Sequence, residues 1–386
     1  MFQTPPLILS DNSYNSLSIA KFLSALGLYK NDSLINTPTV PLSVSNKGMV
    51  GITPAVSNTF PVGISPSSIA ITPDGLYAYV CNNNDPSISG SDSVSVLDLT
   101  NGIPYTTITH SSFSQPYAIA IYNNVAYVCN SNSNSITMIS TTTNTVTGTI
   151  TGFNGPSGIV VVGTTAYVIN YGYSGGTGSG EGTTMSVVNN NTITDTITVG
   201  TAPATLAVTP DQEYIYVGLY ENGTVGSGQV KVVSVLTNTV LTTITGFFGP
   251  FAIAMNPNGL KAYVTNFGSN NFAPYGTTVS VITLESNTIT NTINVGIQPS
   301  GAVVSPNGLY LYVSNYNTLY LGTDYSLLTA GGGVISIIDT ETETVISPGI
   351  SVGMSPSNLI IDPLGLYLYV SNYTGNTVNS IYINQG

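Results

Sequence analysis

One short pattern, a Tyr-Val pair inside a strand-like run, recurs seven times along the chain and limits what it can fold into. The tyrosines stand at 79, 127, 167, 216, 263, 312 and 369, at intervals of 48, 40, 49, 47, 49 and 57 residues. A proline recurs with the same count, at 66, 116, 156, 203, 250, 299 and 356. Self-similarity at this spacing indicates one supersecondary unit used seven times around a shared core.

Each repeat reads as four short strands. An apolar run follows the periodic proline, a turn such as PDG or PNG leads to the Tyr-Val strand, and two alternating strands follow, joined by a TNT or SNT turn. This period-two alternation with tight Asn-Gly or Asp-Gly turns, and no helical period between them, is typical of a propeller blade. The sequence therefore predicts an all-β, seven-bladed β-propeller.

The two ends of the repeat region predict how the ring closes. After YVSNYTGNTVNSIYINQG the seventh unit has three strands and lacks its fourth. The segment SNTFPVG, residues 57–63, precedes the first proline as SNTITNTINVG precedes a later one. We expect this N-terminal strand to complete the last blade, which would leave no open sheet edge.

The repeat resembles a known family. KAYVTN at 261–266, with AYVCN, LYVSN and TNTV elsewhere, is similar to the YVTN-type β-propeller repeats of archaeal cell-surface and surface-layer proteins. The resemblance covers about residues 57–386, although only the fifth repeat keeps the Thr of the motif. It implies the propeller fold and a cell-surface setting, and it implies no particular activity, because propellers carry many unrelated functions.

Residues 1–48 match no repeat and are predicted to be an N-terminal arm, with the propeller at 49–386. The arm contains one amphipathic pattern, which predicts a short helix. Its apolar face consists of Ile19, Phe22, Leu23 and Leu26. We expect this face to anchor the chain to other structural proteins of an assembly, because a lone short helix is marginal in water without a partner surface. The competing interpretation is that the helix folds back onto the propeller.

Charge excludes some partners. Only 6% of the residues are charged, the five basic residues are all lysines, and the net charge is −12. No basic stripe exists that could bind phosphates, so we expect no nucleic acid as a partner. No apolar run is long enough to span a membrane. Because polarity rests on amides and hydroxyls, protonating the carboxylates would change this surface little, which favours an acidic or extracellular setting.

The predicted face of the ring that carries the connections after the second strands is the candidate binding face. Five of these connections are long and rich in Tyr, Gly, Ser and Asn, whereas the hairpin turns on the opposite face stay short. This residue mixture is typical of binding surfaces, because Tyr gives contact area at low entropic cost. The candidate residues are Tyr171, Tyr173, Tyr220, Phe267, Phe272, Tyr275, Tyr316, Tyr320 and Tyr325. The alternative is that several of these rings only order the loops.

Catalytic patterns are weak. The single histidine, His110, is expected at the surface, and Asp74, Asp98 and Asp211 recur at turn positions that explain them without paired carboxylate chemistry. Cys81 and Cys129 occupy equivalent places in two repeats and are expected to be free buried thiols. No catalytic residue, metal or cofactor is predicted, although calcium in the first long loop stays open.

These patterns predict a non-enzymatic surface protein. The most specific expectation is a virion surface protein of an archaeal virus, with the long-loop face contacting a host surface protein or glycan. A basic leader is absent before the arm helix, which favours a particle assembled inside the cell. The alternative is a cellular surface-layer or adhesion protein at the cell surface, and a propeller lactonase or lyase comes third.

Overall fold

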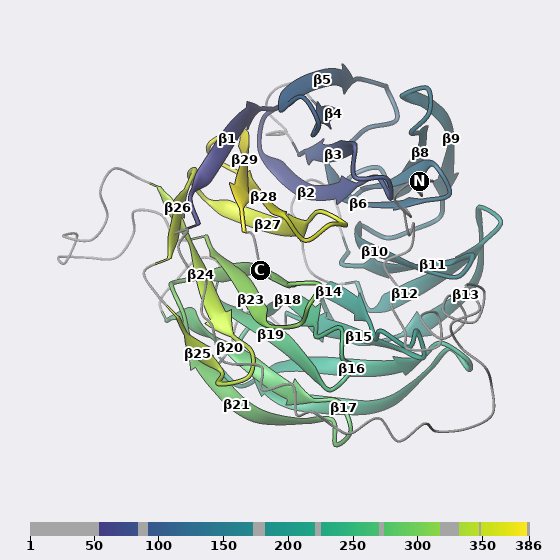
Figure 1. The fold of residues 1–386 in the computed structure, drawn as a ribbon. Coiled ribbons are helices and arrows are strands. Elements are labelled where there is room, and N and C mark those ends of the chain that lie inside the picture. The colour runs from purple at the N-terminus through teal and green to yellow at the C-terminus, as the bar shows by residue number, and fades with distance from the viewer. Residues whose placement is uncertain are drawn as a thin grey trace, which may run out of the picture.

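The computed structural model describes residues 54–83, 92–172, 182–220, 225–269, 274–316, 332–346 and 349–383. The N-terminal arm, with its predicted helix face of Ile19, Phe22, Leu23 and Leu26, lies outside these residues. Within them the chain is all-β and forms seven sheets arranged as a β-propeller. Figure 1 shows the sheets following one another in a ring, in the order of the chain. The predicted seven-bladed propeller is confirmed.

All seven inner strands begin at the periodic proline, which suits an edge strand because Pro lacks the N–H of a ladder bond. The inner strands are β2 (Pro66–Ile71), β6 (Pro116–Tyr122), β10 (Pro156–Val162), β14 (Pro203–Val208), β18 (Pro250–Met255), β22 (Pro299–Val304) and β27 (Pro356–Ile361). Each contacts the inner strand of the next blade, and β27 contacts β2. The inner strands therefore form a closed ring around the axis of the molecule.

The Tyr-Val pairs lie on the second strands, as predicted. These strands are β3 (Tyr77–Asn82), β7 (Val125–Asn130), β11 (Thr165–Asn170), β15 (Tyr214–Leu219), β19 (Lys261–Gly268), β23 (Tyr310–Asn315) and β28 (Tyr367–Asn372). The third strands are β4 (Ser93–Asp98), β8 (Ser135–Ser140), β12 (Thr184–Asn189), β16 (Gly228–Ser234), β20 (Tyr275–Thr283), β24 (Gly333–Asp339) and β29 (Thr377–Tyr382). Most side chains of both sets are buried, because each sheet is covered by its two neighbours.

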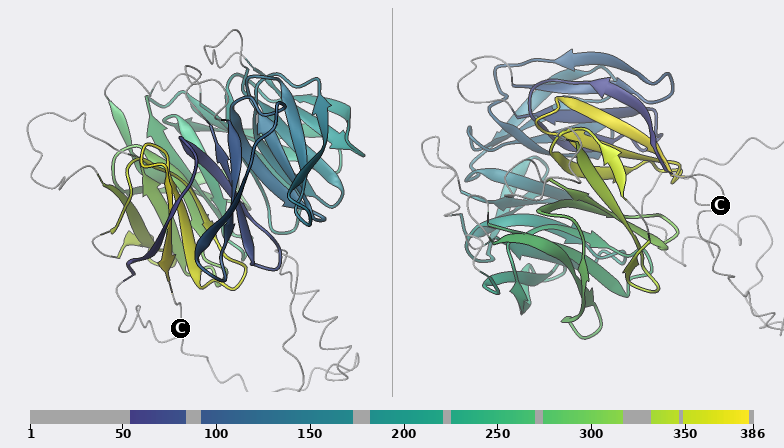
Figure 2. Two further views of the ribbon diagram at one scale, coloured as in Figure 1. Left: turned by 90° about the horizontal axis from the view of Figure 1, so that it is seen from above. Right: turned by 90° about the vertical axis from the view of Figure 1, so that its left-hand side faces the viewer.

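The outer strands are more exposed. They are β5 (Ile103–Ile108), β9 (Thr145–Thr151), β13 (Thr192–Thr198), β17 (Thr239–Phe247), β21 (Thr288–Asn294) and, in blade six, the pair β25 (Thr344–Val345) and β26 (Ile350–Val352). The outer strand of blade seven is β1 (Val56–Pro61), which pairs antiparallel with β29. Figures 1 and 2 show the purple N-terminal strand beside the yellow C-terminal strands. The predicted closure by an N-terminal strand is confirmed.

The tyrosine of the repeat ties one blade to the next on the face that carries the hairpin turns. In three blades its hydroxyl donates to the Asn side chain at the left-handed position of the next blade's TNT or SNT turn. These bonds join Tyr79 to Asn144, Tyr167 to Asn238 (3.3 Å) and Tyr216 to Asn287 (2.5 Å). The Tyr-Val and TNT motifs therefore recur together because they meet across the seam between blades.

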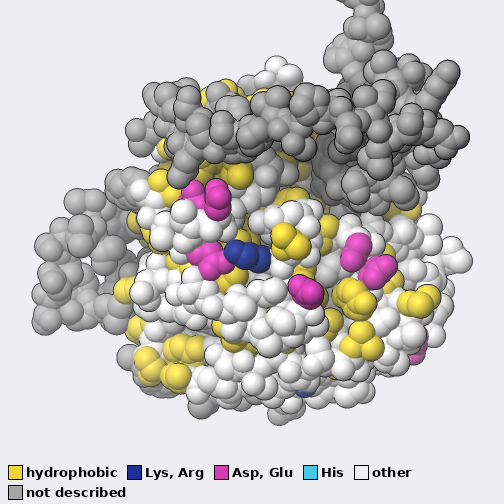
Figure 3. Space-filling view, turned by 60° about the horizontal axis from the view of Figure 1, so that its bottom comes forward, with side chains coloured by type: hydrophobic (Ala, Val, Ile, Leu, Met, Phe, Trp, Pro, Cys, Tyr) yellow, Lys and Arg dark blue, Asp and Glu magenta, His cyan; other side chains and the backbone are white. Residues whose placement is uncertain are grey.

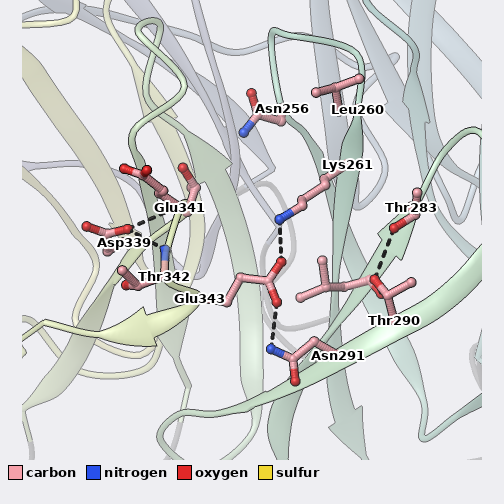
Figure 4. Close-up of polar contacts among 12 residues, drawn as sticks. Asn256, Leu260, Lys261, Thr283, Thr290, Asn291, Asp339, Glu341, Thr342 and Glu343 are labelled. Atoms are coloured by element: carbon pink, nitrogen blue, oxygen red, sulfur yellow. Dashed lines mark hydrogen bonds and ion pairs between the residues drawn. The ribbon is translucent and has the colours of Figure 1, made fainter. Parts of the chain in front are cut away.

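The seam between blades five and six differs, because Glu343 replaces the turn Asn at the left-handed position. Lys261 Nζ lies 2.5 Å from Glu343 Oε1, and Asn291 Nδ2 donates to Oε2 at 2.6 Å. Figure 4 shows Glu343 held between these two side chains of blade five. Among the described residues this is the one ion pair, so uncharged hydrogen bonds carry most polar contacts between blades.

Candidate binding site at the channel mouth

A repeated backbone hydrogen bond fixes the geometry of one end of the central channel. The residue before each periodic proline has a left-handed φ, between 52° and 59° in all seven blades. Its carbonyl accepts the N–H of a residue at or just beyond the C-terminal end of the second strand, at 2.9–3.1 Å. We call the seven residues that donate these bonds the rim residues. They are Asn83, Ser131, Tyr171, Tyr220, Phe267, Tyr316 and Tyr373.

Five consecutive blades, the third to the seventh, place an aromatic residue at the rim. With Phe251 of the inner strand β18, these rings form an aromatic arc, in which ring pairs connect Tyr220 to Tyr373 and Tyr171 packs against the same cluster; its members are Tyr171, Tyr220, Phe251, Phe267, Tyr316 and Tyr373. Ring centroids are 6.3 Å apart for Tyr220–Phe251, 4.8 Å for Phe251–Phe267, 6.0 Å for Phe267–Tyr316 and 6.4 Å for Tyr316–Tyr373. Such offset and tilted pairs are the favoured aromatic geometries.

The arc has two layers. Tyr220 and Phe267 are buried, at 4% and 5% exposed, and the Tyr220 hydroxyl donates to the Gly268 carbonyl at 2.7 Å. Tyr171, Phe251, Tyr316 and Tyr373 are only partly buried and border the cavity. The buried pair therefore supports the rings that can contact a ligand.

The arc borders a cavity of about 1160 Å³ at this end of the channel. Blades one and two contribute the polar residues Ser65, Asn83, Gln115 and Ser131 to the lining, beside the ring of Tyr117. Among the described residues that line the cavity, none carries a charge. Elsewhere too, charged groups are sparse, and Figure 3 shows them scattered over a largely uncharged surface. The mouth thus combines ring faces, which come mainly from blades three to seven, with amides and hydroxyls.

Serines at the position after the periodic proline join neighbouring inner strands by hydrogen bonds. Ser67 Oγ donates to the Tyr117 carbonyl at 2.9 Å, and Ser300 Oγ donates to the Pro356 carbonyl at 2.8 Å. At the same position blades two and five carry Tyr117 and Phe251, which line the cavity. The position thus carries a serine in four blades, a ring in two, and Ala204 in blade four.

Burial shifts the tyrosines of the mouth toward their neutral form. Burial raises the pKa of Tyr117, and the nearby phenols of Tyr171, Tyr373 and Tyr316 raise it further. Burial also raises the pKa of Tyr171 and of Tyr316. These phenols thus stay protonated over the whole physiological range, and each can donate or accept a hydrogen bond at a ligand.

Five predicted binding residues lie in described parts of the mouth. Tyr171, Tyr220, Phe267, Tyr275 and Tyr316 all border the cavity. Tyr173, Phe272, Tyr320 and Tyr325 lie outside the described residues.

Three further aromatic residues of the mouth were missed by the sequence reasoning, which weighed loop length. Tyr373 follows Asn372 as Tyr316 follows Asn315, but the connection after it is short. Tyr117 and Phe251 stand directly after the periodic proline. The position of a residue within the repeat, rather than the length of the loop that follows, is the signal that could have identified these three residues.

The remaining residues considered for catalysis lie where the sequence predicts them. His110 is exposed, with Nδ1 2.8 Å from Ser112 Oγ. Asp74 accepts from Thr72 Oγ1 at 2.6 Å within its turn. Cys81 and Cys129 are free and buried, and burial raises the pKa of each thiol.

Two further searches cover only the described ranges. Within these ranges, no three His, Cys, Asp or Glu side chains gather as metal ligands would. No helix in the described part of the chain is long and apolar enough to cross a membrane.

Comparison with known proteins supports the fold. The chain is similar to a solved structure titled Kuenenia stuttgartiensis hydrazine synthase, with a TM-score of 0.69 and 18% identity over 88% of this chain and all of that one. No protein-family model and no curated protein sequence matches the chain. At this identity the likeness establishes the class of fold, a β-propeller, and carries no activity with it.

Proposed function

We propose that this chain is a non-enzymatic binding protein exposed on a surface, and that the channel mouth is its attachment site. The aromatic arc carries this proposal. Partly exposed rings of Tyr171, Phe251, Tyr316 and Tyr373 are held by a buried layer of rings and by backbone bonds. Rigid aromatic groups around a concave cavity are typical of ligand sites and of the energetic centres of interfaces.

The setting we favour is the surface of an archaeal virus particle, with the mouth facing the host and the arm joined to other particle proteins. A cellular surface layer is the alternative. Support comes from the resemblance of the repeat to archaeal surface propellers and from a chain in which only 6% of the residues are charged. A surface that owes its polarity to amides and hydroxyls changes little when carboxylates are protonated in acid.

Attachment can be tested with the labelled full-length chain and envelopes prepared from archaeal cells. The wild-type chain should bind, and the double variant Tyr316→Ala with Tyr373→Ala should lose most of the binding, because both rings border the cavity. Tyr105→Ala is the matched control, since Tyr105 is an exposed tyrosine on the outer strand β5. Equal binding by the double variant would remove the mouth from the attachment role. Antibody detection in purified particles or in cell envelopes would separate the two settings.

The arm is tested separately. Phe22→Asp with Leu26→Asp should leave the propeller folded and prevent entry into particles or oligomers, because charges on the apolar face would disrupt contact with another chain. Thermal melting of the isolated chain and its oligomeric state distinguish this outcome from the fold-back alternative, in which stability falls and assembly persists.

A further inference from the structure

We infer that the channel mouth binds a neutral oligosaccharide. This inference rests on the proposed attachment function and adds the chemical class of the ligand. The starting observation is the absence of charge among the described residues that line the cavity. A ligand recognised through phosphate, sulfate or carboxylate would bury that charge without a partner, which is costly. The net charge of −12 also disfavours polyanions at long range.

The two kinds of side chain at the mouth match the two kinds of surface on a sugar ring. A pyranose presents C–H groups on its faces and hydroxyls around its edge. Tyr171, Tyr316 and Tyr373 offer partly exposed rings at the cavity. Asn83, Gln115 and Ser131 offer amides and a hydroxyl. Amides and hydroxyls both donate and accept, so they can pair with sugar hydroxyls in either sense.

A peptide fits the mouth less well. Peptides that bind by strand addition do so mainly through main-chain hydrogen bonds to an exposed edge. At the rim, all seven backbone N–H groups already donate to the carbonyl of the residue before the proline. The rim therefore offers side chains rather than backbone N–H groups for contacts with a ligand. This favours a ligand that is recognised through hydroxyl contacts and ring stacking.

The size of the site favours several sugar units over one. The cavity holds about 1160 Å³, whereas pockets for drug-sized ligands hold roughly 300–1,000 Å³. The arc also runs across five blades, from Tyr171 to Tyr373. A chain of sugars could thus stack along successive rings, while a monosaccharide would contact only a part of the arc.

The test is calorimetric titration of the full-length chain with short neutral oligosaccharides of glucose, mannose, galactose and N-acetylhexosamines, each beside a sulfated counterpart. At least one neutral oligomer should bind and its sulfated form should bind more weakly. Tyr373→Ala and Tyr316→Ala should each weaken binding about fivefold, which corresponds to about 1 kcal/mol for the loss of one aromatic contact. Tyr316→Phe, which keeps the ring, should retain most of the affinity. Tyr105→Ala should bind as the wild type does.

Phe251→Leu tests whether a loss of binding comes from misfolding. This substitution keeps apolar volume beside Phe267 and removes only a ring face. Its binding should fall while its melting temperature stays close to that of the wild type.

Two results overturn the inference. If no neutral oligomer binds, while attachment to envelopes is abolished by protease and survives periodate oxidation of sugars, the ligand is a protein and the attachment function stands. If sulfated and neutral oligomers bind equally, recognition does not follow the uncharged lining. Conversely, oligosaccharide binding without envelope attachment would support this inference and refute the proposed function.

Discussion

The two faces of the propeller differ in which groups of the repeat make the recurring hydrogen bonds. On the hairpin-turn face, side chains make the recurring contacts: Thr209 Oγ1 donates to Asp211 Oδ1 at 2.5 Å, and Ser305 Oγ donates to Asn307 Oδ1 at 2.7 Å. At the channel mouth, the recurring contact is a backbone hydrogen bond to the residue before each proline. The turn side chains are thus constrained, whereas the side chains of the rim residues are free to differ.

This difference explains where a binding surface can develop on a repeat protein. Replacing a turn side chain removes a bond that the fold needs, whereas replacing a rim side chain leaves the backbone bond in place. The rim accordingly carries Asn83 and Ser131 in two blades and aromatic residues in the other five. The rim side chains can therefore vary without changing the ring, and the following predictions test that separation.

The largest effect should come from opening the ring itself. Deleting residues 1–63 removes β1, so the outer edge of β29 loses its partner and becomes open for aggregation. Deleting only residues 1–45 keeps β1 and should leave the propeller folded. Thermal melting and size-exclusion chromatography of the two truncations measure this. Equal melting temperatures would contradict the closing role of β1.

A smaller but substantial loss should follow when a buried amide network at the mouth is broken. Asn266 Nδ2 donates to Thr278 Oγ1 and Ser280 Oγ, both at 2.9 Å, and Oδ1 accepts from the N–H of Phe248 at 3.2 Å. Asn266→Leu leaves these groups without their partner and should cost about 2–3 kcal/mol in the free energy of unfolding, measured by urea denaturation.

Blade four supplies the matched control for this network. It carries Leu219 at the equivalent position, opposite Gln229 rather than a hydroxyl. Leu219→Asn should also destabilise, because the new amide would be buried among apolar groups. A neutral Asn266→Leu would show that the network does not stabilise blade five.

One substitution made on both faces compares them directly. Tyr216→Phe removes the hydroxyl that donates to Asn287 across a blade seam at 2.5 Å and should cost about 1 kcal/mol. Tyr316→Phe, at the mouth, removes a hydroxyl that hydrogen-bonds the Ser355 side chain, and should cost less, about 0.5 kcal/mol, because Tyr316 is only partly buried. Urea unfolding of both variants measures the two losses in the free energy of unfolding. A larger loss for Tyr316→Phe than for Tyr216→Phe would contradict the difference between the two faces.

The smallest effect concerns acid. Asp362 is buried, and its Oδ1 accepts the N–H groups of Leu366 and Tyr367 at 2.7 and 2.8 Å. Burial nevertheless raises the pKa of Asp362 above its ordinary value of 3.8. The folded state therefore binds the proton more tightly than the unfolded state, so stability falls as pH rises from 3.8 through the folded pKa.

Asp362→Asn should accordingly raise the melting temperature at neutral pH and lose this advantage below about pH 3.8. Asp98→Asn is a control of opposite sign, because hydrogen bonds from Asn101 lower the pKa of Asp98. Melting curves between pH 7 and pH 3 measure both variants. A constant difference between Asp362→Asn and the wild type across this range would contradict the assignment.

Part of the candidate site could be predicted from sequence. The candidate face follows from strand alternation, and Tyr171, Tyr220, Phe267, Tyr275 and Tyr316 border the cavity at that face because they lie at the ends of the second strands or at the start of a third. Their division into two layers could not be predicted, since burial of Tyr220 and Phe267 depends on contacts between blades that are distant in sequence. Tyr117 was missed for a related reason, because its neighbours at the mouth come from blades three, six and seven.

The sequence by itself determined the ring. Periodic Pro, Tyr-Val and TNT motifs encode local strands and turns, and their number encodes seven blades with a last strand supplied from the N-terminus. Only the tertiary structure decided which rings at the cavity are buried and which are partly exposed. The physical reason is that local motifs fix backbone hydrogen bonds within a blade. The aromatic arc and the uncharged cavity, by contrast, arise where side chains from several blades meet across the channel.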